Sequence, residues 1–224
     1  MVRLGDVIDT LHAAYPPALA EEWDTGIGLT CGDPDTDIAV LLVDVDADAR
    51  TISEAVQRGA GLLLTHHPLL FRPVQSVAAD TAKGELIHRM IRAGLAHFAA
   101  HTNADKAVGG VNDALAQELG MVDVRPLVPD RSAAGGPGTG SGRVGRLPQP
   151  MRLSAFCERV AELLPGTVTG VRAAGDPDRL LSTIAVCGGA GDSFLDAAAA
   201  ARVDGYLTSD LRHHVVAEFV ADPS

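Results

Sequence analysis

Short apolar runs alternate with amphipathic segments along most of this chain, and that alternation restricts its fold more than any other feature. The runs at residues 38–45 (IAVLLVDV), 61–65 (GLLLT) and 95–100 (LAHFAA) are typical of buried strands. Segments with the apolar spacing of helices follow each of them, at residues 47–60, 81–94 and 109–120. This order predicts an α/β fold, with a largely parallel sheet covered by helices on both faces.

Residues 130–143 (DRSAAGGPGTGSGR) interrupt the alternation with a stretch rich in glycine, serine and proline. Such a composition without periodicity indicates a flexible linker or an exposed loop. The pattern then resumes, with helices expected at residues 151–164, 191–203 and from 211 onward, and strands at 182–189 and 205–209. We therefore expect one α/β unit at residues 1–129 and a second at 144–224.

The charge balance excludes several classes of function. The chain has 29 acidic and 18 basic residues, a formal net charge of −11 at pH 7, so it repels phosphate backbones and anionic membranes and attracts divalent cations. No apolar run approaches the roughly 20 residues of a membrane span. Three scattered cysteines indicate neither a disulfide framework nor a cysteine-ligated zinc site. We expect a cytoplasmic protein that binds neither bulk nucleic acid nor membranes.

The strongest local signal is a pair of histidines directly after a buried strand. The apolar run at residues 61–65 leads into His66, His67 and Pro68. In open α/β sheets, ligand sites form at the carboxyl ends of strands. Adjacent residues of a strand point to opposite faces, so both imidazoles serve one site only if the chain has already left the sheet, which Pro68 favours. Neutral imidazoles are ligands for zinc and other transition metals.

A second polar segment, HTNAD, follows the strand expected at residues 95–100. A parallel sheet would place it beside the histidine pair, so Asp105 supplies a carboxylate for the same metal site. His101 is either a further ligand or a residue that orients Asp105 by a hydrogen bond, and we favour the second role. A lone histidine at a strand end is more often a hydrogen-bonded structural residue, which is our interpretation of His12, His88 and His97.

Two further motifs carry less weight. After the last expected strand, His214 and Glu218 have the i, i+4 spacing of helical metal ligands. A short polar helix often carries such a pair by chance, so we do not assign them to the metal. The turn at residues 188–191 (GGAG) opens a helix and has backbone amides suited to an anion, but packing alone also explains it.

Taken in order, these segments resemble one family, the NIF-three-like proteins with a dinuclear metal centre, also described as GTP cyclohydrolase I type-two homologues. The matching stretches are EWD with GL at 22–29, LLLTHHPLLF, HTNAD, GGVNDALAQELG, GRVGRLP, AVCGGAG and GYLTSDLRHH. The resemblance implies two α/β lobes with largely parallel or mixed sheets, and a toroidal homohexamer. It also implies that His66, His67 and Asp105 are metal ligands, with up to two divalent ions (zinc, manganese or iron) per chain.

One departure concerns the end of the chain. The family adds a histidine and a glutamate four residues apart in a G-H-x-x-x-E segment, and this sequence stops at Ser224, before such a segment. His213 matches a family histidine of the preceding block. We therefore expect the second lobe to lack the last two ligands, so that the second ion is in doubt.

The function that the resemblance implies is metal-dependent hydrolysis, in which a metal-activated water attacks C8 of the purine ring of GTP or a similar small nucleotide-like substrate. His101 or His213 would then move protons. The alternative is a ring-shaped metal-binding scaffold or regulator that acts through protein partners without catalysis.

Overall fold

The computed structural model describes residues 1–221 and divides them into two compact units, Met1–Ala107 and a second that begins at Val108. Each unit has its own sheet and its own hydrophobic core. Within the described part of the chain, no helix has both the length and the apolar character needed to cross a membrane. The expectation that the last two metal ligands are missing refers to the end of the sequence at Ser224, which lies outside the described residues.

The first unit is built on a four-stranded sheet with the order β2-β6-β5-β4. β4, β5 and β6 run parallel, and β2 pairs antiparallel with β6. The bounds of these strands are β2 Gly28–Cys31, β4 Leu41–Asp44, β5 Leu62–Thr65 and β6 Ala96–Ala99. Two shorter strands, β1 (Val2–Arg3) and β3 (Asp37–Ile38), form a separate antiparallel pair. The three predicted parallel strands are confirmed, whereas β2, at residues 28–31, is a strand that the apolar runs did not predict.

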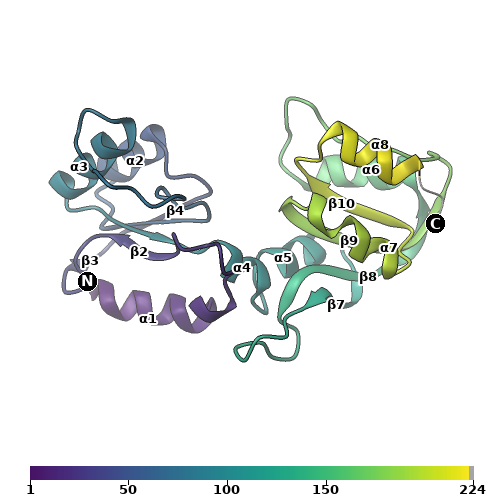
Figure 1. Ribbon diagram of the computed structural model, residues 1–224, viewed down its shortest axis with the longest axis horizontal. Helices are drawn as coiled ribbons and strands as arrows, with labels where there is room; N and C mark the ends of the chain where they lie inside the picture. Colours follow the sequence, from purple (N-terminus) through teal and green to yellow (C-terminus); the bar gives the residue numbers. More distant parts are fainter. Residues whose placement is uncertain (222–224) are drawn as a thin grey trace. The chain divides into compact units, whose positions relative to one another are not determined.

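Helices cover both faces of this sheet because the strands are apolar on both sides. α1 (Leu4–Ala14) lies on one face, and α2 (Ala49–Gln57) and α3 (Ala82–Ala93) lie on the other (Figure 1). Successive side chains of β5 point to opposite faces of the sheet. Leu62 packs in the core under α1, and Leu63 packs in the core under α2 and α3. Short helical turns, η1 (Pro17–Leu19) and α4 (Thr102–Lys106), complete the unit.

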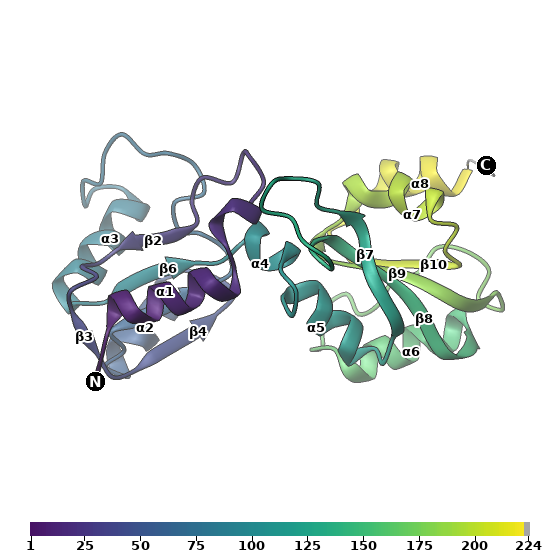
Figure 2. The same ribbon diagram turned by 90° about the horizontal axis from the view of Figure 1, so that it is seen from below.

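The second unit has a four-stranded mixed sheet with the order β10-β9-β8-β7. β7, β8 and β9 are successively antiparallel, and β10 is parallel to β9. The strands are β7 Val122–Pro129, β8 Gly140–Arg152, β9 Leu180–Ala190 and β10 Gly205–Ser209. α5 and α6 lie on one face of this sheet, and α7 and α8 on the other (Figure 2). These helices are α5 Val111–Glu118, α6 Leu153–Leu163, α7 Leu195–Ala200 (after the 3₁₀ turn η2, Asp192–Phe194) and α8 His213–Ala221.

The α/β class with helix-flanked parallel and mixed sheets is confirmed, but the division between the units differs from the predicted one. Residues 108–129 belong to the second unit, because β7 pairs with β8 and α5 packs on that unit's core. Residues 130–143 therefore do not link two units. Residues 130–139 form the connection between β7 and β8, and residues 140–143 are already part of β8.

Candidate metal centre

The predicted site residues lie at the carboxyl edge of the first unit's parallel strands. Asp44 at the end of β4 pairs with Thr65 at the end of β5, and Thr65 pairs with Ala99 of β6. The three chains therefore leave the sheet side by side. This register places the residues that follow β4, β5 and β6 next to one another, which is the arrangement that the parallel sheet predicted.

The chain leaves the sheet immediately after Thr65, and the histidine pair occupies the first two positions beyond it. The backbone N–H of His66 donates to the carbonyl oxygen of Asp44 (3.3 Å), and that of His67 to Val45 (2.8 Å). The Thr65 hydroxyl donates to the carbonyl oxygen of His67 (2.7 Å) and so holds the turn. The two imidazole rings have centroids 5.0 Å apart. Both rings therefore lie on one side of the edge, as a shared site requires.

His101 brings a third imidazole to the same place. It directly precedes α4, and its ring centroid lies 5.1 Å from that of His66 and 5.7 Å from that of His67. One ligand atom from each of the three rings falls within 4.8 Å of the others. We call these three residues the histidine cluster. Sequence reasoning favoured an orienting role for His101, and the geometry instead places its ring among the potential ligands.

Hydrogen bonds fix which nitrogen of each imidazole ring is available to bind a metal ion. Nδ1 of His66 lies 2.9 Å from the carbonyl oxygen of Ala100, Nδ1 of His67 lies 2.8 Å from Asp46 Oδ1, and Nδ1 of His101 lies 3.0 Å from Asp24 Oδ2. Carbonyl and carboxylate oxygens only accept, so each Nδ1 carries the proton and donates it. Every Nε2 then keeps its lone pair. Orientation of metal-binding histidines through the opposite ring nitrogen is the usual support of metal sites.

Asp105, the predicted carboxylate ligand, lies beside the histidine cluster, on the side of His66, and is not one of the three residues whose ligand atoms lie within 4.8 Å of one another. Its Oδ1 lies 3.8 Å from His66 Nε2. Burial raises the pKa of Asp105 to about 6, and nearby Asp24 adds to the rise while His101 and His67 oppose it. Burial also lowers the pKa of His66, as do the neighbouring imidazoles, so that His66 is neutral at pH 7. A cation between these groups would stabilise the ionised carboxylate and occupy the imidazole lone pairs.

The donor set fits a divalent transition metal. Zinc and related ions take imidazole nitrogen and carboxylate oxygen at about 2.1 Å, which places two tetrahedral ligands about 3.4 Å apart. The 3.8 Å between His66 Nε2 and Asp105 Oδ1 is close to that spacing. Asp24 contributes further negative charge, since its carboxylate is buried and its Oδ1 meets no hydrogen-bond donor among the described residues. A buried carboxylate with one unpaired oxygen favours a cation nearby.

Sequence reasoning missed the two carboxylates that orient the rings. Asp24 lies in the loop before β2 and accepts hydrogen bonds from the Thr102 amide (3.1 Å) and hydroxyl (2.6 Å) as well as from His101. Asp46 follows β4 and binds His67. Asp46 could have been found, because it lies after a parallel strand just as His66 and His101 do. For Asp24 the only signal was its place in the EWD stretch of the family resemblance.

His97 and His213 are not part of the histidine cluster. His97 is fully buried in β6 and hydrogen-bonds to the hydroxyls of Thr30 and Thr65, which confirms the structural role expected for it. His213 begins α8 in the second unit, with its ring 5.5 Å from that of His214, and its proton-shuttle role stays a prediction.

The glycine turn at residues 188–191 uses its backbone amides internally. Gly188 N–H donates to Asn112 Oδ1, and Gly191 N–H to Thr208 Oγ1. This pattern favours the packing interpretation of the turn over anion binding.

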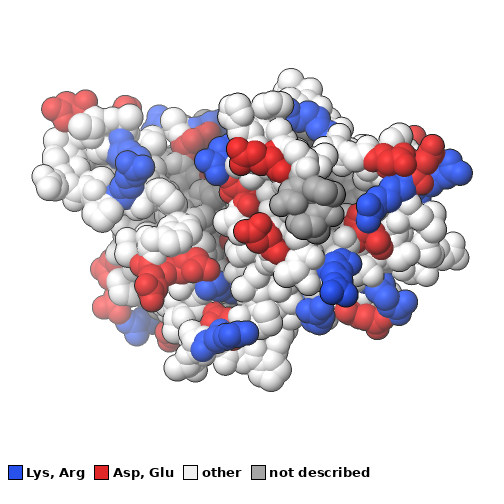
Figure 3. All heavy atoms as spheres, turned by 45° about the vertical axis from the view of Figure 1, so that its right-hand side comes forward, with Lys and Arg blue, Asp and Glu red and all other residues white. Residues whose placement is uncertain are grey.

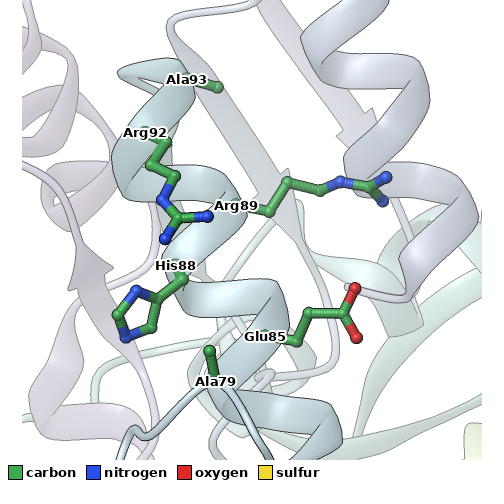
Figure 4. A pocket seen from close by; sticks show the side chains of 6 residues that line it. All are labelled: Ala79, Glu85, His88, Arg89, Arg92 and Ala93. Atoms are coloured by element: carbon green, nitrogen blue, oxygen red, sulfur yellow. The ribbon is translucent and has the colours of Figure 1, made fainter.

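A hollow on the outer side of α3 is also lined by titratable side chains (Figure 4). His88 and Arg92 point to one side of the helix, and Glu85 and Arg89 to the other. Arg89 donates to the hydroxyl of Ser53 on α2 (2.8 Å), so its guanidinium ties the two helices together. The hollow therefore has a structural explanation.

Charged side chains of both signs are interspersed on the face of the molecule drawn in Figure 3. Among the described residues on that face, no continuous basic tract of the kind that a phosphate backbone requires is visible. The expectation that the chain binds no bulk nucleic acid stays a prediction.

Comparison with known proteins adds an independent line of evidence. The model of the Duf34/NIF3 (NGG1p interacting factor 3) family matches residues 2–223. A Streptomyces coelicolor protein named GTP cyclohydrolase 1 type 2 homolog is 48% identical over 97% of this chain and 76% of its own length. A Mycobacterium tuberculosis protein of the same name is 38% identical over 95% of this chain and 83% of its own. A Bacillus cereus protein related to NIF3 has the same fold, with a TM-score of 0.89 at 24% identity, covering 98% of this chain and 85% of that one.

Proposed function

The chain belongs to the Duf34/NIF3 family, and we propose that it binds divalent metal ions and hydrolyses a small nucleotide-like substrate with their help. The observation that carries this proposal is the convergence of three imidazole ligand atoms within 4.8 Å, each ring oriented by an acceptor at Nδ1. The printed names of the Streptomyces and Mycobacterium relatives, GTP cyclohydrolase 1 type 2 homolog, point to hydrolysis of a purine nucleotide.

His66, His67 and Asp105 are the proposed ligands, and His101 is the proposed fourth donor. The Nε2 atoms of the three histidines present lone pairs, and Asp105 presents a carboxylate oxygen. Zinc, manganese and iron all accept this mixture of nitrogen and oxygen donors. An ion held by these residues would supply Lewis acidity, which would make water more acidic and stabilise negative charge on the substrate.

The chain itself contributes orientation and charge. Asp24 and Asp46 hold the proton of His101 and His67 at Nδ1, so neither ring can turn away from the site without losing a hydrogen bond. Asp24 also anchors Thr102 at the start of α4, which fixes the helix that carries Asp105. The proton carrier proposed from the family resemblance is His101 or His213, because an imidazole can both donate and accept a proton.

Metal binding is tested by elemental analysis and calorimetric titration with zinc, manganese and iron(II). We expect the unmodified chain to retain a stoichiometric ion and His66→Ala to lose it. His88→Ala is the matched control, because His88 lies on α3 outside the histidine cluster. Equal metal content in the His66 and His88 variants would contradict the proposed site.

Catalysis is tested separately, by following ring opening of GTP in the metal-loaded protein. Loss of turnover in His66→Ala with an unchanged oligomeric mass would support the enzyme. Metal binding without turnover of GTP or related nucleotides would favour the second candidate, a scaffold or regulator that acts through protein partners. The family description, NGG1p interacting factor 3, names a protein interaction and is the observation in favour of that second role.

The proposed assembly is a toroidal homohexamer with the metal sites facing its cavity. It rests on the family resemblance alone. Mass measurement in solution tests it directly, and a monomeric mass would exclude the cavity.

A further inference from the structure

Two exposed aromatic side chains lie beside the histidine cluster, in a chain that has few aromatics. The sequence contains one tryptophan, two tyrosines and five phenylalanines among 224 residues. Trp23 is 59% exposed and Phe71 is 47% exposed. Exposing two of the largest apolar side chains costs hydrophobic stabilisation, so their common position next to potential ligands calls for a functional explanation.

The rings of Trp23 and Phe71 lie at an angle to each other beside His101, and we call this pair the aromatic corner. The centroids of Trp23 and Phe71 are 5.9 Å apart, with 58° between the ring planes. Both rings meet His101 edge-on, Trp23 at 6.1 Å and Phe71 at 6.0 Å. The aromatic pair thus contacts the imidazole that stands 5.1 Å from His66, and it adjoins the histidine cluster directly.

The loops that carry the two rings are fixed by specific contacts. Trp23 precedes Asp24, whose buried carboxylate binds His101 and Thr102. The Trp23 loop packs closely on the Phe71 loop, since a Cβ built on Gly26 would lie 2.9 Å from the carbonyl oxygen of Leu70. These contacts hold the aromatic corner in place before any ligand arrives, which lowers the entropic cost of binding.

We propose that Trp23 and Phe71 form a subsite that stacks a planar heteroaromatic ring and presents its edge to the histidine cluster. The inference rests on the proposed function, because a ring held here is useful only if the chemistry takes place at the cluster. A parallel ring between two others needs about 7 Å between the outer planes. Since the two centroids are only 5.9 Å apart, the ligand does not enter between them and lies on the open face of Trp23, with Phe71 as a side wall.

This arrangement selects a class of ligand. Stacking on an aromatic face works for every flat nitrogen heterocycle, whereas it gives nothing to a phosphate chain. The base of a nucleotide would therefore supply affinity through Trp23, independently of the ion. Removal of one stacking partner typically weakens base binding by about 5- to 150-fold.

The test uses GTP as the aromatic probe and inorganic tripolyphosphate as its ring-free counterpart. Because Trp23 is the only tryptophan, its fluorescence reports the subsite directly. We expect GTP to quench this fluorescence and tripolyphosphate to leave it unchanged. By calorimetry, Trp23→Ala should raise the Kd for GTP about tenfold or more, Phe71→Ala and Trp23→Phe should raise it less, and tripolyphosphate binding should not change.

Ile91→Ala is the matched control, because Ile91 is 63% exposed on α3 and lies outside the aromatic corner. Metal content is measured in every variant. An unchanged Kd for GTP in Trp23→Ala, or the absence of quenching by GTP, ATP and CTP alike, would overturn the subsite. A fall in oligomeric mass of Trp23→Ala would also overturn it, since the pair would then be an interface between copies.

The same measurements in His66→Ala separate this inference from the proposed function. Loss of the metal with retained quenching would support the subsite. If Trp23→Ala keeps its metal, its turnover and an unaltered Kd for GTP, the proposed hydrolase function is unaffected and the subsite is refuted.

Discussion

His97 should make the first unit sensitive to acid, because folding keeps its imidazole neutral. The ring is fully buried in β6, where Thr30 and Thr65 hydrogen-bond to its two nitrogens. Burial lowers the pKa of His97 to about 4, from 6.5 in the unfolded chain. Below pH 6.5 the unfolded state therefore binds a proton that the folded state does not bind.

The magnitude follows from the two pKa values. This group contributes its full stabilisation above pH 6.5 and loses it as the pH falls towards 4. Linkage gives a loss of about 2 kcal/mol at pH 5 and roughly 3 kcal/mol below pH 4.

The assay is urea unfolding followed by Trp23 fluorescence between pH 7.5 and pH 4, with chelator present so that no metal contributes. Trp23 lies in the first unit, so the signal reports the unit that contains His97. In His97→Gln the decline in unfolding free energy between pH 6.5 and 4 should be smaller by up to about 3 kcal/mol. His88→Gln should behave as the unmodified chain. Parallel pH profiles for His97→Gln and the unmodified chain would refute the reasoning.

Three further predictions follow from buried charges and the metal. Asp24→Asn should weaken metal binding about 10- to 100-fold, because it removes the carboxylate charge behind His101, and calorimetry that shows unchanged affinity would contradict it. Asp46→Asn should weaken metal binding less, because Asp46 is exposed, and an effect larger than that of Asp24→Asn would reverse this order. Arg143→Met should destabilise the second unit by about 3 kcal/mol, because Arg143 is 1% exposed and binds Asp113 and two backbone carbonyls. Amide hydrogen exchange in β8 would detect this change, and full protection in the variant would exclude it.

The parallel core of the first unit was predictable from local pattern, whereas other strands were not. Residues 38–45, 61–65 and 95–100 are continuous apolar runs, which predict strands buried on both faces. Burial is confirmed for β5 and β6, whereas β4 at the sheet edge leaves Leu41 and Val43 exposed. β2 is only four residues long and begins at Gly28, which gives too short a pattern to separate from a loop. β7 contains Pro126 and Pro129, which argue against a strand in general and are tolerated here because β7 lies at the edge of its sheet.

The predicted linker shows the limit of compositional reasoning most clearly. Glycines at 140 and 142 indicate a flexible segment by composition, but they adopt positive φ angles of 146° and 60° inside β8. Arg143, at the end of that segment, is among the largest fully buried side chains of the described chain. Its burial depends on Asp113 of α5, a partner that no local pattern identifies.

For the candidate site, the sequence by itself determined which side chains leave the sheet at strand ends, namely His66, His67, His101 and Asp105. Only the tertiary structure decided that the three imidazoles converge, that Asp24 and Asp46 orient them, and that Trp23 stands beside them. The physical reason is that hydrophobic periodicity is encoded among neighbours in the chain. The hydrogen-bond acceptors come from loops distant in sequence, and the order and register of the strands bring them together.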